Sequence, residues 1–297
     1  MQALLEELGA KCARVSPESD AEILNRAMTS SRISAVIVPK LDALAPGREI
    51  PAQLDALLRL LAETRETGIP LVILCSDAAV YRTSQNPWNL QEDAPIGGET
   101  AHGLAHSLLQ LAADGVSRGL LGDAVSTIIV RHPPCLGCGH PQVAQYGAWC
   151  SALLNNEVPC ICHAGTPGIF VHPLDICCGA LLLGARYLLG DRRITGAVNL
   201  GASPANIAAN RTAALRFLSA NGGARPIREL HPPSFGALPV PDGAKARLLC
   251  GAHCLIPADE ALCMLLELER AAAQGYAAEQ EHMHQAVKAY TEKFAQF

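Results

Sequence analysis

The stretch from residue 70 to residue 107 constrains the fold of this chain more than any other. An unbroken apolar run at 70–75 predicts a buried strand, which ends in polar and small residues. A polar loop follows, and then a helix that carries two histidines four residues apart, His102 and His106. A strand, a turn of small residues and a helix with two polar side chains on one face form an active-site arrangement found in α/β proteins. We therefore expect a functional site where this strand ends.

The same alternation of strand and helix continues along the chain. Short apolar runs predict strands, and apolar residues three or four positions apart predict helices. The expected strands are 11–15, 33–38, 70–75, 125–131 and 197–201. The expected helices are 2–9, 16–28, 52–67, 101–113, 143–156, 176–189, 203–220, 258–273 and 277–295, with 222–257 as a loop. Asp175 is expected to cap the helix that starts at Ile176. This order predicts a mostly parallel sheet that helices cover.

Five segments, in this order, are similar to the motifs of one enzyme family. They are Leu60–Gly68, Ser76–Tyr81, Arg131–Gly137, Gly168–Ile176 and Ala197–Gly201. The second ends in Val-Tyr, like the family's Ser-Ser-x-x-x-Val-Tyr-Gly, and the fourth carries its Phe-Val-His. Over about residues 1–270 the chain resembles the extended short-chain dehydrogenase/reductases. These are the NAD(P)-dependent nucleotide-sugar epimerases, dehydratases and reductases.

The resemblance implies an α/β fold with a doubly wound, mostly parallel Rossmann-like sheet and a smaller C-terminal substrate-type region. Residues 1–200 would form the Rossmann-like domain, and residues 201–297 the substrate-type region and the terminal helices. Part of 134–172 would also contribute to the second region. The usual first strand and its glycine-rich loop have no counterpart here, because Met1 falls inside the helix that normally follows that loop.

The catalytic positions of the family carry different residues in this chain. Its catalytic Ser or Thr falls at Asp77, next to Ser76, and its Tyr-x-x-x-Lys falls at His102 and His106. The two histidines have three open interpretations: an acid–base pair, two metal ligands, or relics and surface residues of a lapsed site. We favour the lapsed site, where substituting an exposed histidine would cost under about 0.5 kcal/mol. Asp77 could be a base, or it could cap the turn after the strand.

The resemblance implies NAD or NADP as cofactor, but the positions that would line its site also depart from the family. The family's Ala-Ala is Pro39-Lys40, an Asn in the next helix is Gln53, and the Asn of its Arg-x-x-Asn motif is Pro134. In the family, the glycine-rich loop lets the backbone approach the pyrophosphate at a helix N-terminus, and this chain has no counterpart of that loop. We therefore expect NAD(H) and NADP(H) to bind weakly or not at all.

Three residues of one loop, Cys135, Cys138 and His140, have the spacing of metal ligands. A structural zinc site needs a fourth ligand. The candidates for it are Cys160, Cys162 and His163. A proline-rich loop accounts for the same residues without a metal, and we predict no metal site. We interpret the remaining cysteines as reduced, small apolar side chains that fill space in the core.

The composition of the chain limits the classes of partner that we expect it to bind. The net charge is −5, and no cluster of Lys and Arg is dense enough for a nucleic-acid footprint. No charge-free apolar run reaches the roughly 18 residues of a membrane span, and the N-terminal segment is acidic, unlike a signal peptide. We expect a cytoplasmic protein with neither nucleic-acid nor membrane partners.

The resemblance also implies a homodimer, because the family pairs the helices that match 52–67 and 101–113 into a four-helix bundle. Here these helices carry more apolar surface than one buried face requires. The leucines concerned are Leu57, Leu60, Leu61, Leu104, Leu108 and Leu111.

Three functions stay open. The first is a degenerate family member that binds a nucleotide-sugar, another small molecule or a partner. The second is an active epimerase, dehydratase or reductase that uses the histidine pair. The third, more remote, is a metal-dependent enzyme. The missing Tyr-x-x-x-Lys and the missing glycine loop favour the first.

Overall fold

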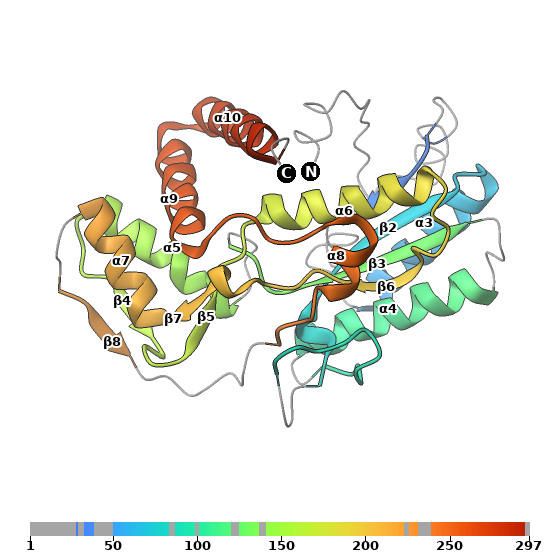
Figure 1. Cartoon of the computed structure of the whole chain (residues 1–297), viewed down its shortest axis with the longest axis horizontal. Helices are drawn as coiled ribbons and strands as arrows, with labels where there is room; N and C mark the ends of the chain where they lie inside the picture. Colours follow the sequence, from blue (N-terminus) through green and yellow to red (C-terminus); the bar gives the residue numbers. More distant parts are fainter. Residues whose placement is uncertain are drawn as a thin grey trace.

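The computed structural model describes residues 28, 33–38, 50–82, 87–98, 101–119, 125–136, 141–222, 226–230 and 239–294. The elements expected before residue 28 lie outside this part of the chain, as do Pro39 and Lys40. The described residues form two regions, a sheet with helices on both faces and a smaller, mainly helical region beside it (Figure 1).

The main sheet has four parallel strands. They are β1 (Val36–Val38), β2 (Leu71–Asp77), β3 (Ser126–His132) and β6 (Gly196–Asn199), in the order β1-β2-β3-β6. β2 and β3 pair over seven residues, from Leu71 with Ser126 to Asp77 with His132. The predicted mostly parallel α/β sheet is confirmed.

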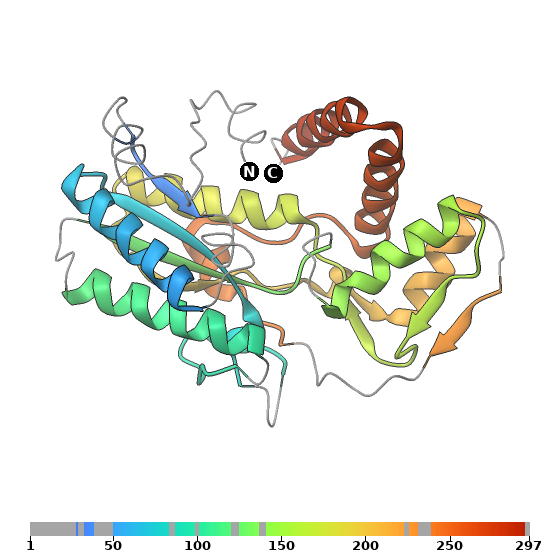
Figure 2. The ribbon, with the colours of Figure 1, turned by 180° about the vertical axis from the view of Figure 1, so that it is seen from behind.

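Helices cover both faces of this sheet. α3 (Ile50–Glu66) and α4 (Ala101–Gly119) lie on one face, which Figure 2 shows from the front. α6 (Pro173–Leu188) and α8 (Ala244–Cys250) lie on the other.

The two cores follow from the two-residue period of a strand. Val72 and Leu74 of β2 point into the α3–α4 core, while Ile73 and Cys75 point into the core under α6 and α8. All four side chains are buried, as expected for a central parallel strand with helices on both faces.

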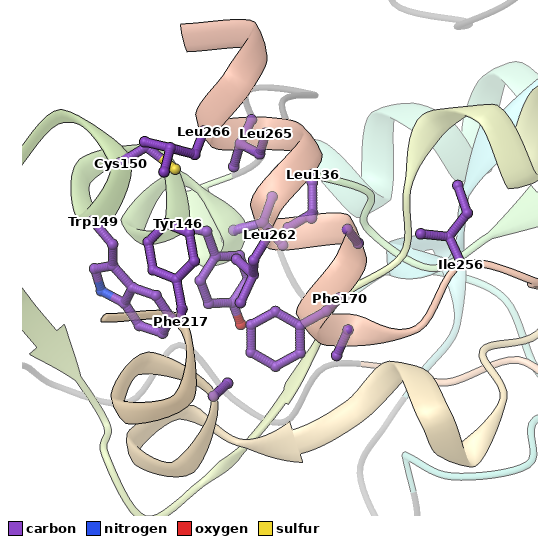
Figure 3. Packing of buried hydrophobic residues seen from close by; sticks show 14 of the residues in the cluster. Leu136, Tyr146, Trp149, Cys150, Phe170, Phe217, Ile256, Leu262, Leu265 and Leu266 are labelled. Carbon is purple, nitrogen blue, oxygen red and sulfur yellow. The ribbon is translucent and has the colours of Figure 1, made fainter. Parts of the chain in front are cut away.

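The smaller region has its own hydrophobic core (Figure 3). Its helices are α5 (Pro141–Leu154), α7 (Asn210–Gly222), α9 (Ala258–Gln274) and α10 (Tyr276–Phe294). Two small sheets complete it: β4 (Cys160–Cys162) pairs in parallel with β8 (Arg228–Leu230), and β5 (Pro167–Ile169) pairs antiparallel with β7 (Ile207–Ala209). Tyr146, Trp149 and Phe170 pack ring against ring in the core. None of the helices in the described part of the chain combines the length and hydrophobicity of a membrane span.

Two sequence expectations for this region are wrong. The expected helix 203–220 is instead a single turn (Pro204–Asn206), the strand β7 and then α7. Asn206 closes the turn by bonding back to Ser203, and the following residues pair with β5, so tertiary strand pairing replaces helix. The expected loop 222–257 contains β8 and α8.

The expected role of Asp175 as a helix cap is also wrong. α6 starts at Pro173, and its N-cap is His172, whose Nδ1 accepts from the backbone N–H of Leu174 at 3.2 Å. Burial lowers the pKa of His172 to about 4, so the imidazole is neutral near pH 7 and free to accept. Nδ1 of His172 is therefore engaged in capping α6.

Asp175 instead joins three segments of the chain. Its carboxylate accepts from the backbone N–H groups of Leu255 and Ile256, at 3.0 and 3.3 Å, and from the hydroxyl of Tyr290 at 2.9 Å. It therefore ties α6 to the segment before α9 and to α10. Burial raises the pKa of Asp175, and the three donors oppose that shift.

The first prediction concerns the packing of α4 on the turn Ala78–Val80. Gly103→Ala should lower the free energy of unfolding by about 1–3 kcal/mol, because overpacking has that cost. The added Cβ would lie 2.1 Å from the carbonyl oxygen of Ala79, a backbone atom that cannot rotate away. Urea denaturation followed by circular dichroism measures the change.

Gly115→Ala, in the same helix, is the matched control. No atom lies within 4 Å of its added Cβ, and the position is exposed. Alanine should stabilise the helix here by about 0.5–1 kcal/mol. Equal effects of the two substitutions would contradict the described contact.

Candidate functional site

Three polar side chains lie side by side at the carboxyl ends of the strands. Ser76 of β2 pairs with Arg131 of β3, and Arg131 pairs with Asn199 of β6. Residues paired in parallel strands point to the same face, here the face that α4 covers. All three are buried, with exposed fractions of 7% or less.

Helix α4 adds two polar side chains, His106 and Gln110, to this row. They are four residues apart and so share one face of the helix. Gln110 donates from Nε2 to Ser76 Oγ and accepts at Oε1 from Arg131 Nε at 2.8 Å. Ser76 Oγ lies 3.3 Å from Nδ1 of His106.

Arg131 fixes the direction of donation in this chain of hydrogen bonds as far as Ser76. A guanidinium can only donate, so the amide oxygen of Gln110 must face it and the amide nitrogen must face Ser76. Ser76 Oγ therefore accepts from Gln110. Its second lone pair and its own proton allow the contact with Nδ1 of His106 to run in either direction, as the tautomer of the imidazole decides.

Arg131 also forms hydrogen bonds to residues other than Gln110. Its Nη1 donates to the hydroxyl of Tyr81 at 2.9 Å and to the backbone carbonyl of Glu92 at 2.8 Å. Tyr81 donates in turn to Oδ1 of Asn199 at 2.7 Å. Burial raises the pKa of Tyr81, although the adjacent guanidinium opposes the shift, so the phenol stays protonated and can donate.

The loop that follows β2 closes over the end of β6. The Glu92 carboxylate accepts from the backbone N–H of Asn199 at 2.9 Å, and the carbonyl of Leu90 accepts from its side-chain amide at 2.7 Å. Leu90 also bonds to Val240, in a segment that returns from the smaller region. The strand ends are therefore covered by two chain segments.

The residues expected to be catalytic have structural partners in this arrangement. Ser76 and His106 belong to the buried row, and the expectation that the histidines are surface residues is wrong for His106, which is 1% exposed. Asp77 caps the turn Ala78–Val80 by accepting from the backbone N–H of Ala79 at 2.7 Å, as the capping interpretation predicts. His102 lies in α4, but its side chain is outside the described part of the structure.

Sequence reasoning missed Gln110 and the central place of Arg131 in this network. Gln110 is the next residue after His106 on the same face of α4, which is a signal that the sequence contains. Arg131 is a charge at the end of an apolar strand, but its acceptors come from residues 81, 92 and 110, which only the fold brings together.

Two of the four residues expected to line a cofactor lie in the described structure. Gln53 is buried in the first turns of α3, and Pro134 is buried after β3. Within the described ranges, no glycine-rich turn leads from a strand into the N-terminus of a helix. Weak or absent binding of NAD(H) and NADP(H) stays a prediction.

The expected absence of a metal site stays a prediction. Among the described residues, no three His, Cys, Asp or Glu side chains are placed to share an ion. Cys135 is buried in the core beneath α6, while Cys138 and His140 lie outside the described part. Cys160 and Cys162 lie on β4 of the other region, and His163 follows them with a φ of 51°.

The second prediction tests the network through Gln110. Gln110→Met keeps the side-chain length but leaves the buried Nε of Arg131 without its acceptor. The free energy of unfolding should fall by about 1–3 kcal/mol, the cost of an unsatisfied buried polar group.

The control is Gln285→Met, on the exposed side of α10, which should change the free energy of unfolding by less than about 0.5 kcal/mol. Chemical denaturation of both variants gives the comparison. Indistinguishable stabilities would show that the network carries no net stabilisation.

No family model and no curated protein matches the chain. Solved structures do. A UDP-glucose 4-epimerase from Thermotoga maritima, determined with UDP-glucose, superimposes with a TM-score of 0.68 at 16% identity, over 89% of this chain and 85% of that one. A Thermus thermophilus UDP-glucose 4-epimerase in complex with NAD gives 0.65 at 17% identity, over 89% and 86%.

The dTDP-glucose 4,6-dehydratase DesIV of Streptomyces venezuelae, with NAD and TYD bound, gives a TM-score of 0.66 at 18% identity, over 87% of this chain and 80% of that one. At such low sequence identity, the structural similarity shows a shared fold and no more. The chain has the fold of the nucleotide-sugar epimerases and dehydratases, the extended short-chain dehydrogenase/reductase fold that its sequence motifs resemble.

Proposed function

We propose that this chain is a ligand-binding protein with the nucleotide-sugar epimerase/dehydratase fold and with lapsed hydride-transfer chemistry. The observation that carries the proposal is the buried chain of hydrogen bonds from Arg131 through Gln110 and Ser76 to His106. It occupies the place where the resemblance puts the catalytic groups.

A general acid or base must reach the proton that it transfers. His106 is buried, and its Nδ1 lies 3.3 Å from Ser76 Oγ, so this nitrogen already has a partner within the row. Asp77 is likewise engaged, as the cap of the turn after β2. These contacts support structural roles for both side chains.

The residues at the cofactor positions also support the loss of hydride transfer. Hydride transfer requires a nicotinamide, and the protein's task is to position it. The described positions that would line the dinucleotide, Gln53 and Pro134, carry other residues than the family's asparagines. Loss of hydride chemistry, with retention of the fold, agrees with these departures.

A nucleotide-sugar is the ligand class that we propose. The neighbours include an epimerase determined with UDP-glucose and the protein MoeE5 in complex with UDP-glucuronic acid and NAD. The smaller region, which corresponds to the substrate-type region that the resemblance implies, is kept in this chain with a packed aromatic core.

The third prediction separates a lapsed enzyme from an active one. Calorimetry with NAD(H) and NADP(H) should give no dissociation constant in the low micromolar range or below. UDP-glucose and dTDP-glucose, each with NAD present, should not be turned over.

In the same experiment, UDP-glucose or dTDP-glucose alone should raise the midpoint of thermal unfolding, with free glucose as the control. Turnover that His106→Ala abolishes would instead establish an active enzyme. Absence of any thermal shift with either nucleotide-sugar would refute the proposed ligand class.

We also propose a homodimer, with α4 as its interface. Leu104, Leu108 and Leu111 are 47%, 45% and 54% exposed, and their spacing places them on one face of the helix. Leu57 and Leu61 of α3 are fully buried against the sheet, so the expectation that they face a partner is wrong.

The fourth prediction is that Leu108→Glu converts the dimer to a monomer, because it sets a charge in the centre of an apolar interface. Leu215→Glu, at a similarly exposed leucine of α7 (44%), should leave the dimer intact. Sedimentation equilibrium at micromolar concentration measures the mass. A monomeric unsubstituted protein would rule out the dimer.

A further inference from the structure

Strand β4 presents two thiols on one face. Ile161, between them, is fully buried in the core of the smaller region. Cys160 and Cys162 therefore point to the opposite side of the strand, and both are partly exposed. Residues two apart on a strand have Cα atoms about 6.6 Å apart, so their sulfur atoms can rotate toward each other.

The strand that carries these thiols is held firmly along both edges. On one edge, Nε1 of Trp149 donates to the carbonyl of Cys160 at 2.9 Å, and Oε1 of Gln145 accepts from the N–H of Cys162 at 3.1 Å. On the other edge lies β8, where Arg228 pairs with Cys160. The backbone beneath the thiols is therefore preorganised, and a basic residue lies opposite one of them in the neighbouring strand.

Four of the eight other cysteines in the described chain are unsuited to bind a metal. Burial raises the pKa of Cys75 and Cys150 to about 12 and that of Cys178 to about 11, and it also raises the pKa of Cys254. A metal binds the thiolate rather than the thiol, so these sites are disfavoured. Cys160 and Cys162 differ in being partly exposed and in sharing one strand face.

We propose that Cys160 and Cys162 form a two-coordinate thiolate site for a soft monovalent metal ion of the Cu(I) class. Thiolates favour Cu(I) among the biological metals. A closed zinc site needs four ligands, and the described residues offer no group of three. Two sulfur–metal bonds form as two thiol protons leave to solvent, with no change in oxidation state. Arg228 offsets part of the negative charge of the resulting complex.

The test uses the full chain without oxygen, with Cu(I) supplied as its acetonitrile complex and bicinchoninate as the competing chelator. The unsubstituted protein should remove one equivalent of Cu(I) from the chelator. Cys160→Ser and Cys162→Ser should each weaken this binding at least about tenfold, since even outer-shell changes cost metal affinity that much. Cys263→Ser, a partly buried single thiol on α9, is the matched control and should bind like the parent.

A second measurement needs no variant. Cu(I) should protect Cys160 and Cys162 together from alkylation, as read by mass spectrometry of the digested protein. The proposal is overturned if the parent cannot compete with the chelator, or if the double serine variant still takes one equivalent. Protection of other cysteines in place of these two would also overturn it.

Discussion

The buried guanidinium of Arg131 is the constraint on which the carboxyl ends of the strands depend. Arginine cannot give up its proton in a protein, so its neighbours must supply acceptors. The described acceptors are an amide oxygen, a phenol and a backbone carbonyl, all uncharged. Each acceptor comes from a different segment: α4, the end of the turn after β2 and the loop beyond it. One charge therefore fixes three segments against the sheet.

That constraint also decides what the site can do. The guanidinium holds Gln110 in one orientation, and Gln110 in turn donates to the hydroxyl oxygen of Ser76. Enzymes that move protons need a group whose two charge states are both tolerated. In the function that we propose, Ser76 and His106 serve this buried network instead of a proton transfer.

The sequence predicted the sheet well and the site poorly, for one physical reason. β2, β3, α3 and α4 are specified by local apolar runs and periodicity, which a single segment carries by itself. The roles of Arg131 and Asp175 depend on residues far away in sequence, such as Tyr290 for Asp175. The expected helix 203–220 failed in the same way, because its first residues find a strand partner in β5. Local sequence patterns specify the strands and helices of the sheet, whereas tertiary contacts determine the partners of the buried polar groups.

The outer edge of β6 shows how the same polar groups also end the described sheet. A parallel strand could add there through the carbonyl of Ala197 and the N–H of Asn199, which point away from β3. Lys245 Nζ donates to that carbonyl at 2.8 Å, and the Glu92 carboxylate accepts from that N–H at 2.9 Å. Glu92 thus closes the edge with its side chain while its backbone carbonyl accepts from Arg131. Edge protection and charge burial therefore meet at one residue, whose side chain serves the first and whose backbone serves the second.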